Sequence, residues 1–433
     1  MDINRKLAFE ILVDIEKNNA YSNLALNRHL TKFQKDNKNE SLKVGFIREL
    51  VYGVLENKLY FDYVLEQLIP KKINKNRAEI LTILRLAIFQ IENLNSVPDY
   101  AAVDESMQIA NKFYKNQAGF VNGVLRNYLR NKDKIYLDKE NMQTSLFFSI
   151  KYSHAKWIID YWLKFYKEEF VEALLIENNK TPKLCIRANT LKISRKDLIN
   201  KLTEKKYEIE NGSLVPDAIY IKGNHLLDED EFTQGEFSVQ DESSMFAVNI
   251  LDPMPKDVII DVCAAPGGKT LHMAEKMNNQ GEIVAFDIHE HKLNLLEKSA
   301  AKNNIEIIST RIWNSKTVNE EFVNSANKVL VDAPCSGLGV LRRKPELKYK
   351  GDYSTVLNLS KIQEEILESS SKYLINGGIL LYSTCTISEV ENQGVVAEFI
   401  KKNPEFEIIE ERQLFPNVDF TDGFYICKMQ KKV

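Results

Sequence analysis

The second half of the sequence alternates short apolar runs with longer helical patterns, and this alternation limits the possible folds more than any other feature. The apolar runs are VIIDVC, EIVAFDI, KVLVDAPC and GILLYSTC. Strands that alternate with helices form a mostly parallel, doubly wound sheet. Ligands of such sheets bind outside the carboxyl ends of the strands, where all four runs carry their unusual residues. We therefore expect an α/β domain with its site along this edge.

The first part of the chain has a different pattern. Leu7, Ile11 and Ile15 share one face of a predicted helix, and the segments 46–69 and 79–94 repeat this spacing. This pattern predicts an all-helical domain over residues 1–135.

Between these parts, the sequence first predicts further helices. The block 182–212 then has the order strand, basic turn, amphipathic helix, strand. Residues 136–235 are thus expected to form linker helices and a small α+β segment, and residues 236–433 the α/β domain.

Bulk properties exclude several classes of protein. No apolar run approaches the roughly 18 residues of a membrane span, and the N-terminus is amphipathic instead of resembling a signal peptide. We expect a cytoplasmic protein that does not contact membranes. The net charge of −3 argues against a uniformly basic nucleic-acid binder but is compatible with local basic patches.

The chain has five cysteines and no CxxC pair, which suits neither a disulfide framework nor a structural zinc site. An isolated cysteine is usually an inert packed thiol. Cys335 and Cys385, however, each follow a predicted strand, at 329–331 and 379–382. If these strands are neighbours, both thiols lie in the ligand cleft, where a thiolate is a nucleophile. His289 and His291 are more typical of a surface helix start than of a metal site, so no metal is expected.

A glycine turn follows the first of these strands, in DVCAAPGGKT. Gly267 and Gly268 let the backbone approach a ligand, and the helix N-terminus behind them offers free N–H groups. The spacing fits neither GxGxxG nor the Walker A pattern, and a tight turn without a ligand is the alternative. Asp287, about 20 residues further on, can bind a ribose diol. It also suits a helix cap, and the two roles are compatible.

Basic residues follow Cys335 in LRRKPELKYK. Such a run is usually a solvated loop. Its position beside the expected cleft favours contact with a nucleic-acid backbone. The expected RNA-binding residues are Arg342, Arg343, Lys344 and Lys348.

Three segments together resemble motifs I, IV and VI of the RNA cytosine-5 methyltransferases, which use S-adenosylmethionine. They are DVCAAPGGKT, DAPCSGLGVLRRKPELK and YSTCTISEVEN. RELVYGVL, LRLAIFQI, AAVDESMQIA and FVNGVLRN resemble the NusB-like domain of the bacterial RsmB (Sun/Fmu) branch, and PKLCIRANTLK and GEFSVQDESSMFAV also match that branch. The resemblance covers nearly the whole chain. It implies an all-α NusB-like RNA-binding domain, a small α+β RNA-binding segment, and a Rossmann-like methyltransferase domain.

The resemblance also implies a mechanism. Carbon 5 of cytosine is a poor nucleophile, and a thiolate that adds to carbon 6 activates it. Cys385 is implied as this nucleophile, and Cys335 as the residue that assists product release. Asp332 would bind the N3/N4 edge of the base and stabilise the adduct, with Lys269 at the floor of the cleft.

The implied cofactor is S-adenosylmethionine. In this family an acid stands after the third strand, near the adenine, and here Trp313 and Asn314 occupy that region. We expect Asn314 to bind the adenine edge. The implied cofactor-binding residues are Cys263, Ala264, Ala265, Pro266, Gly267, Gly268, Lys269, Asp287, Asn314 and Asp332.

The implied reaction is methylation of carbon 5 of a cytosine in 16S rRNA, cytosine 967 by family resemblance. The expected partner is 16S rRNA or the assembling small ribosomal subunit, and a monomer is the default. One alternative is the same chemistry on tRNA, which the NusB-like segments disfavour. Another is a non-catalytic RNA-binding or antitermination factor, against which the two cysteines, Asp332 and the glycine turn argue.

Overall fold

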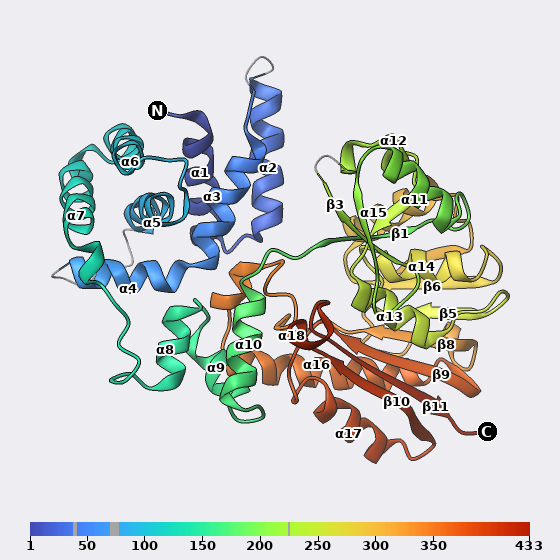
Figure 1. Cartoon of the computed structure of the whole chain (residues 1–433). Helices are drawn as coiled ribbons and strands as arrows, with labels where there is room; N and C mark the ends of the chain where they lie inside the picture. Colours follow the sequence, from blue (N-terminus) through green and yellow to red (C-terminus); the bar gives the residue numbers. More distant parts are fainter. Residues whose placement is uncertain (38–40, 70–77, 224–225) are drawn as a thin grey trace. The chain divides into compact units, whose positions relative to one another are not determined.

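The structure, a computed structural model, describes the chain except for residues 38–40, 70–77 and 224–225. The described residues form two compact units (Figure 1). The first comprises residues 1–180 and 341–351, and the second comprises residues 181–340 and 352–433. The segment 341–351 therefore belongs to the first unit, although both its flanks belong to the second.

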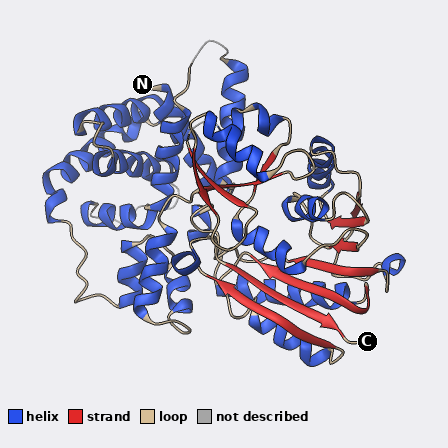
Figure 2. Cartoon of the chain, turned by 45° about the vertical axis from the view of Figure 1, so that its right-hand side comes forward, coloured by secondary structure: helices blue, strands red, loops and turns tan. Residues whose placement is uncertain are grey.

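The first unit is built of helices, whereas the strands lie in the second (Figure 2). The helical fold expected for the N-terminal part is confirmed. A 3₁₀ turn, Pro345–Tyr349, comes from the 341–351 segment. The α-helices are α1 Ile3–Asn18, α2 Ser22–Asp36, α3 Val44–Glu56, α4 Lys58–Leu68, α5 Ala78–Asn93, α6 Asp99–Phe113, α7 Ala118–Asn131, α8 Thr144–Lys151, α9 Lys156–Trp162 and α10 Glu168–Asn178.

Helix α1 shows how the sequence pattern produces this unit. Leu7, Ile11 and Ile15 are at most 4% exposed and join the core of the unit. Asp2 caps the helix by accepting a hydrogen bond from the backbone N–H of Arg5, a contact that contributes about 1 kcal/mol. The helix thus buries the face that the spacing predicts.

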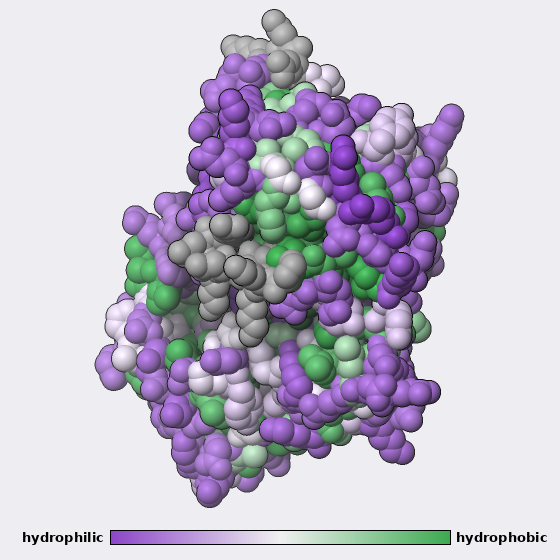
Figure 3. Space-filling model, turned by 90° about the vertical axis from the view of Figure 1, so that its left-hand side faces the viewer, coloured by the Kyte–Doolittle hydropathy of each residue, from purple (hydrophilic) through white to green (hydrophobic). Residues whose placement is uncertain are grey.

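Hydrophilic side chains predominate on the face shown in Figure 3 and surround smaller hydrophobic areas. Within the described part of the chain, none of the helices has the length and apolar character required to cross a membrane.

The second unit begins with a small antiparallel sheet of strand order β2-β3-β1-β4. The predicted order of strand, helix and strand after residue 182 is confirmed by β1, α11 and β2. The elements of this part are β1 Leu184–Ala188, α11 Arg195–Glu204, β2 Glu208–Asn211, β3 Ala218–Lys222, α12 Asp230–Thr233 and β4 Phe237–Val239.

A larger sheet follows, with strand order β10-β11-β9-β8-β5-β6-β7. The strands from β9 to β7 in this order pair in parallel, and β11 and β10 extend the sheet antiparallel to β9. The predicted Rossmann-like, mostly parallel sheet is confirmed. Its strands are β5 Val258–Asp261, β6 Glu282–Asp287, β7 Ile308–Ile312, β8 Ala326–Asp332, β9 Leu374–Thr384, β10 Phe406–Leu414 and β11 Phe424–Lys431.

Helices cover both faces of this sheet because successive side chains of each strand point to opposite faces. Ile259 and Leu381 pack in one hydrophobic cluster with residues of α13, α14 and α15, while Ile260 and Leu380 pack in another with α16 and α17. All four side chains are 0% exposed. The helices are α13 Glu242–Leu251, α14 Gly268–Lys276, α15 Glu290–Lys302, α16 Tyr353–Ser371, α17 Gln393–Lys402 and the short α18 Pro416–Asp419.

Candidate active site

The carboxyl ends of β5, β6, β8 and β9 lie on one edge of the larger sheet because these strands are parallel. Asp261, Asp287 and Asp332 are the last residues of β5, β6 and β8. Cys385 directly follows β9, and Cys335 follows β8 after two further residues. The residues expected to carry the chemistry therefore follow neighbouring strands on one edge.

The glycine turn after β5 adopts a conformation that requires glycine. Gly267 has φ +108°, and a Cβ built on it would lie 2.3 Å from Cδ1 of Leu296. The backbone N–H of Ala264 donates to the carbonyl of Phe286 at 2.9 Å, which ties the turn to β6. Gly268 begins α14, whose first N–H groups have no intrahelical acceptors. The turn can therefore bring a ligand close to the backbone, as its sequence predicts.

The carboxylate of Asp332 is held at both oxygens. Lys269 donates from Nζ to Oδ2 at 2.7 Å, and Ser383 donates from its hydroxyl to Oδ1 at 2.9 Å. The Lys269 ammonium also lies 4.9 Å from the centroid of the Phe424 ring. Each carboxylate oxygen has a second lone pair, so Asp332 can still accept a hydrogen bond from a ligand.

The two thiols are in direct contact. Sγ of Cys335 lies 3.3 Å from Sγ of Cys385, and both residues are partly exposed. The contact with Cys385 and burial raise the pKa of Cys335 well above its ordinary value. Cys335 therefore remains a neutral thiol at neutral pH, and its S–H can donate to the sulfur of Cys385.

Hydrogen bonds between residues far apart in the sequence join the loops that carry the thiols. Glu391 is 0% exposed and accepts from the backbone N–H of Ser336 at 2.8 Å and from its hydroxyl at 2.5 Å. Gln363 donates to the same carboxyl group at 3.1 Å. The N–H of Gly339 donates to the carbonyl of Cys385 at 3.1 Å. These bonds fix the loop after β8 against the loop after β9, and with them the spacing of the thiols.

Sequence reasoning assigned no role to Glu391 or to Asp261. Asp261 is 1% exposed, and the hydroxyl of Thr270 donates to it at 2.8 Å. Burial raises the pKa of Asp261 to about 7, and the nearby charge of Asp332 adds to this effect. Asp261 could have been noticed because it is an acid at the end of the apolar run VIID. Glu391 lies within the motif YSTCTISEVEN, but nothing in that motif indicates its hydrogen bonds.

The acid that ends β6 does not cap α15, whose N-cap residue is His289. Asp287 Oδ1 accepts from the backbone N–H of His289 at 2.8 Å, just before α15. Asn314 follows β7 and is exposed, and its Oδ1 accepts from the N–H of Lys316 at 3.2 Å. Trp313 donates from Nε1 to the carbonyl of Thr317 at 2.8 Å. Roles of Asp287 and Asn314 in cofactor binding stay predictions.

The basic segment after Cys335 lies in the helical unit and is partly buried there. Lys348 is 0% exposed, and its ammonium donates to Oδ1 of Asn179. Burial lowers the pKa of Lys348 to about 8, while the charge of Glu56 opposes the shift. The ammonium of Lys348 is buried in this structure, and the RNA contact expected of it stays a prediction. Arg342 is 8% exposed, Arg343 is half-buried, and Lys344 is exposed.

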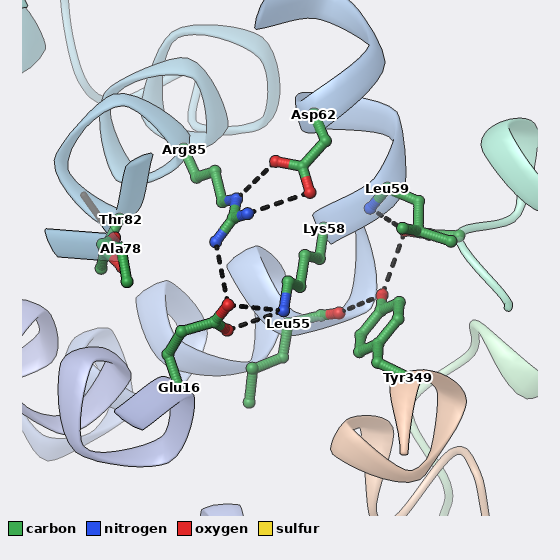
Figure 4. A network of polar contacts seen from close by, with 10 residues as sticks. Glu16, Leu55, Lys58, Leu59, Asp62, Ala78, Thr82, Arg85 and Tyr349 are labelled. Carbon is green, nitrogen blue, oxygen red and sulfur yellow. Dashed lines mark hydrogen bonds and ion pairs between the residues drawn. The ribbon is translucent and has the colours of Figure 1, made fainter. Parts of the chain in front are cut away.

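Neighbouring contacts show why this segment is buried. The hydroxyl of Tyr349 donates to the carbonyl of Leu55, at the edge of the charged network in Figure 4. In that network Glu16 contacts both Lys58 and Arg85. The segment 341–351 therefore packs as part of the helical unit.

In the described ranges, no group of His, Cys, Asp and Glu side chains is arranged to hold a metal ion. The rings of His289 and His291 lie 5.6 Å apart at the start of α15.

One edge of the Rossmann-like sheet carries a glycine turn, the hydrogen-bonded carboxylate of Asp332 and two thiols in contact. This combination defines the protein as a methyltransferase, and comparison with known proteins agrees. Residues 248–430 match the family described as 16S rRNA methyltransferase RsmB/F. Residues 2–130 match the NusB family, and residues 154–227 match the ferredoxin-like domain of RsmF/B-like methyltransferases.

Similar proteins span the whole chain. A probable ribosomal RNA small subunit methyltransferase B of Bacillus subtilis is 36% identical, and the match covers 99% of this chain and 98% of the relative. A relative of the same description from Synechocystis is 31% identical, with 99% of each chain covered. The crystal structure of a methyltransferase homolog from Pyrococcus horikoshii is 27% identical, with a TM-score of 0.61 over 67% of this chain and 99% of that chain. The chain belongs to the RsmB/F methyltransferase family.

Members of this family use S-adenosylmethionine, and the edge of the sheet fits that cofactor. A Cβ built on Gly268 would meet only Nε2 of Gln240, at 4.0 Å, outside the adjoining backbone, so the first residue of α14 leaves room for a ligand. Burial and the charge of Asp261 raise the pKa of Cys263 well above its ordinary value, so this thiol in the turn stays neutral. The cofactor supplies an electrophilic methyl group when bound.

Proposed function

We propose that this protein methylates carbon 5 of a cytosine in 16S rRNA, with cytosine 967 as the target, through a covalent bond between Cys385 and carbon 6. The observation that carries the proposal is the contact of the two thiols at 3.3 Å, on the same edge of the sheet as Asp332. The names of the full-length relatives support ribosomal RNA of the small subunit as the substrate class.

In the proposed addition step, the Cys385 thiolate forms a bond to carbon 6, and the π electron pair of the C5–C6 double bond becomes available at carbon 5. Asp332 binds the N3/N4 edge of the cytosine and stabilises the charge that develops on the ring. Lys269 keeps this carboxylate oriented through their 2.7 Å contact. Bound S-adenosylmethionine would supply the methyl group to carbon 5, and the electron pair of its sulfur–methyl bond would stay on the sulfur of S-adenosylhomocysteine, the leaving group.

In the proposed release step, the proton on carbon 5 leaves to solvent, and the electron pair of that C–H bond re-forms the C5–C6 double bond. The bond between carbon 6 and Cys385 breaks, and its electron pair stays on sulfur. Cys335 donates its S–H to that sulfur and stabilises the departing thiolate. The raised pKa of Cys335 supports this role, because a thiol that keeps its proton can donate it.

The target base must leave its stack to reach the thiols, which favours single-stranded or loop RNA. We propose that the NusB-like region, residues 1–135, and the α+β region, residues 136–235, bind the RNA that carries it, and that residues 236–433 perform the chemistry. Exposed Lys344 is the basic residue of the 341–351 segment best placed to contact a phosphate.

Incubation with labelled S-adenosylmethionine and unmethylated 16S rRNA or tRNA tests the proposal. We expect label in 16S rRNA, mapped by bisulfite sequencing to one cytosine, and none with Cys385→Ala. Label in tRNA but not in 16S rRNA would show that the proposed rRNA substrate is wrong. Label that is still incorporated by Cys385→Ala would contradict the covalent mechanism.

A further inference from the structure

Gln240 carries a buried amide group that the chemistry described above does not use. It lies between β4 and α13 and is 7% exposed. Its Oε1 accepts a hydrogen bond from Nε of Arg187 at 2.8 Å, whereas its Nε2 has no hydrogen-bond partner among the described residues. A buried donor without a partner destabilises the folded state, because it has lost its hydrogen bonds to water. Such groups in folded proteins therefore point to a missing partner.

The orientation of this amide is fixed by its neighbour. Arg187 has donors and no acceptors, so the amide oxygen must face it and Nε2 must face away. Arg187 is itself 2% exposed and forms an ion pair with Glu275, which is also 2% exposed. The backbone N–H of Gln240 donates to the carbonyl of Cys185 at 3.2 Å. If the amide were reversed, Nε2 of Gln240 and Nε of Arg187, which are both hydrogen-bond donors, would face each other in a buried site.

The unpartnered Nε2 faces the start of the glycine-turn helix. A Cβ built on Gly268 would lie 4.0 Å from Nε2, and outside the adjoining backbone no other atom lies within 4 Å of it. Gly268 is the first residue of α14, so the free N–H groups of the helix lie in the same region. An amide N–H and a helix N-terminus together form a site for an anionic group.

We propose that Gln240, with the N-terminus of α14, binds the carboxylate at the amino-acid end of S-adenosylmethionine, and that Arg187 positions Gln240 for this contact. The proposal rests on the cofactor of the family. The carboxylate is the anionic group of that cofactor, and its other end carries the ribose and the adenine. Lys269, the nearest cation of the turn, is already paired with Asp332. The buried amide therefore supplies the side-chain donor that this carboxylate needs.

Isothermal titration calorimetry on the full chain can test this proposal without turnover. Two ligands are compared: S-adenosylhomocysteine, which has the carboxylate, and 5′-methylthioadenosine, which lacks the amino-acid end. Gln240→Glu keeps the size of the side chain and its contact with Arg187 but replaces the free donor by an acceptor. We expect S-adenosylhomocysteine to bind about 10- to 100-fold more weakly, because a hydrogen bond to a charged group is lost.

The affinity for 5′-methylthioadenosine should stay within about twofold. Gln280→Glu adds the same charge at an exposed position and should change neither affinity. Gln240→Asn provides a second, uncharged variant that withdraws the donor by one methylene group, and it should show the same selective loss. An equal loss for both ligands, or no loss for either, overturns the proposal. If the unmodified protein binds neither ligand, both the cofactor assignment and this proposal are overturned.

Discussion

The candidate active site lies along the carboxyl ends of the parallel strands of the larger sheet, and the two ends of this edge are held by different kinds of hydrogen bond. After β8 and β9, the thiol loops are tied together by bonds between residues far apart in sequence, such as Ser336 to the fully buried Glu391. After β6 and β7, the side-chain bonds of Asp287 and Asn314 are local, and Asn314 is exposed. Ser315 anchors this second loop by donating to the carbonyl of Val262 at 2.6 Å. Buried polar networks specify one geometry, whereas a local exposed turn tolerates substitution. The sequence departs from the pattern of the resembled family at this second end.

Substitution of Glu391 gives the largest effect that this comparison predicts. Glu391→Ala leaves the donors of Ser336 and Gln363 without their acceptor and lets the thiol loops shift. We expect turnover to fall about 100-fold, because a displacement of about 1 Å is enough for such a loss. The dissociation constant of S-adenosylhomocysteine should change less than about twofold, since its contacts lie elsewhere.

Glu398→Ala, at an exposed position of α17, is the matched control and should leave both quantities unchanged. A parallel loss of turnover and cofactor affinity in Glu391→Ala would show that the two ends are not separate structures.

Asp261 predicts a pH dependence of stability. Its pKa in the folded protein is about 7, raised by burial from an ordinary value of 3.8. The folded state therefore holds this proton more tightly than the unfolded state, and the stability present below pH 3.8 is lost as the pH rises through 7. Asp261→Asn removes this titration. From pH 5 to 8, unfolding by denaturant should show the unmodified protein losing about 2–3 kcal/mol relative to the variant.

The measurement at pH 5 serves as the control, because the Asp261 side chain is then protonated and nearly isosteric with the asparagine of the variant. Parallel stability profiles for the two proteins over this range would contradict the buried state of Asp261.

Gly267→Ala tests the glycine turn between the two ends. The added Cβ would meet Cδ1 of Leu296, and alanine is disfavoured at φ +108°. Such strain costs about 1–3 kcal/mol, so S-adenosylhomocysteine should bind about tenfold more weakly in calorimetry. Gly123→Ala in α7, where a Cβ would meet nothing within 4 Å, should leave binding intact. An unchanged affinity in Gly267→Ala would mean that the turn is not a cofactor site.

Asn314→Asp gives the smallest effect. It restores an acid where the resembled family has one, at an exposed position, so the gain should stay below about 1 kcal/mol. We expect S-adenosylhomocysteine to bind about two- to fivefold more tightly in calorimetry. A change larger than about 30-fold would show that this end is as tightly constrained as the thiol end.

The sequence predicted those features that follow from local pattern. Apolar alternation placed Cys335 and Cys385 after two strands, and the parallel pairing of β8 with β9 made the thiols neighbours. Resemblance supplied their roles. The burial of Lys348 was not predictable, because it depends on Asn179 and Ala155, more than 150 residues away. The unpartnered amide of Gln240 likewise depends on how Arg187 packs.

The central claim is the division of labour between the two thiols. Purified Cys335→Ala and Cys385→Ala variants are incubated with 16S rRNA and S-adenosylmethionine and then separated on a denaturing gel. If Cys385 forms the bond to carbon 6 and Cys335 assists its release, Cys335→Ala accumulates a slowly migrating protein–RNA adduct and Cys385→Ala forms none. An adduct with Cys385→Ala, or no adduct with Cys335→Ala in a preparation that binds the cofactor, would contradict the account.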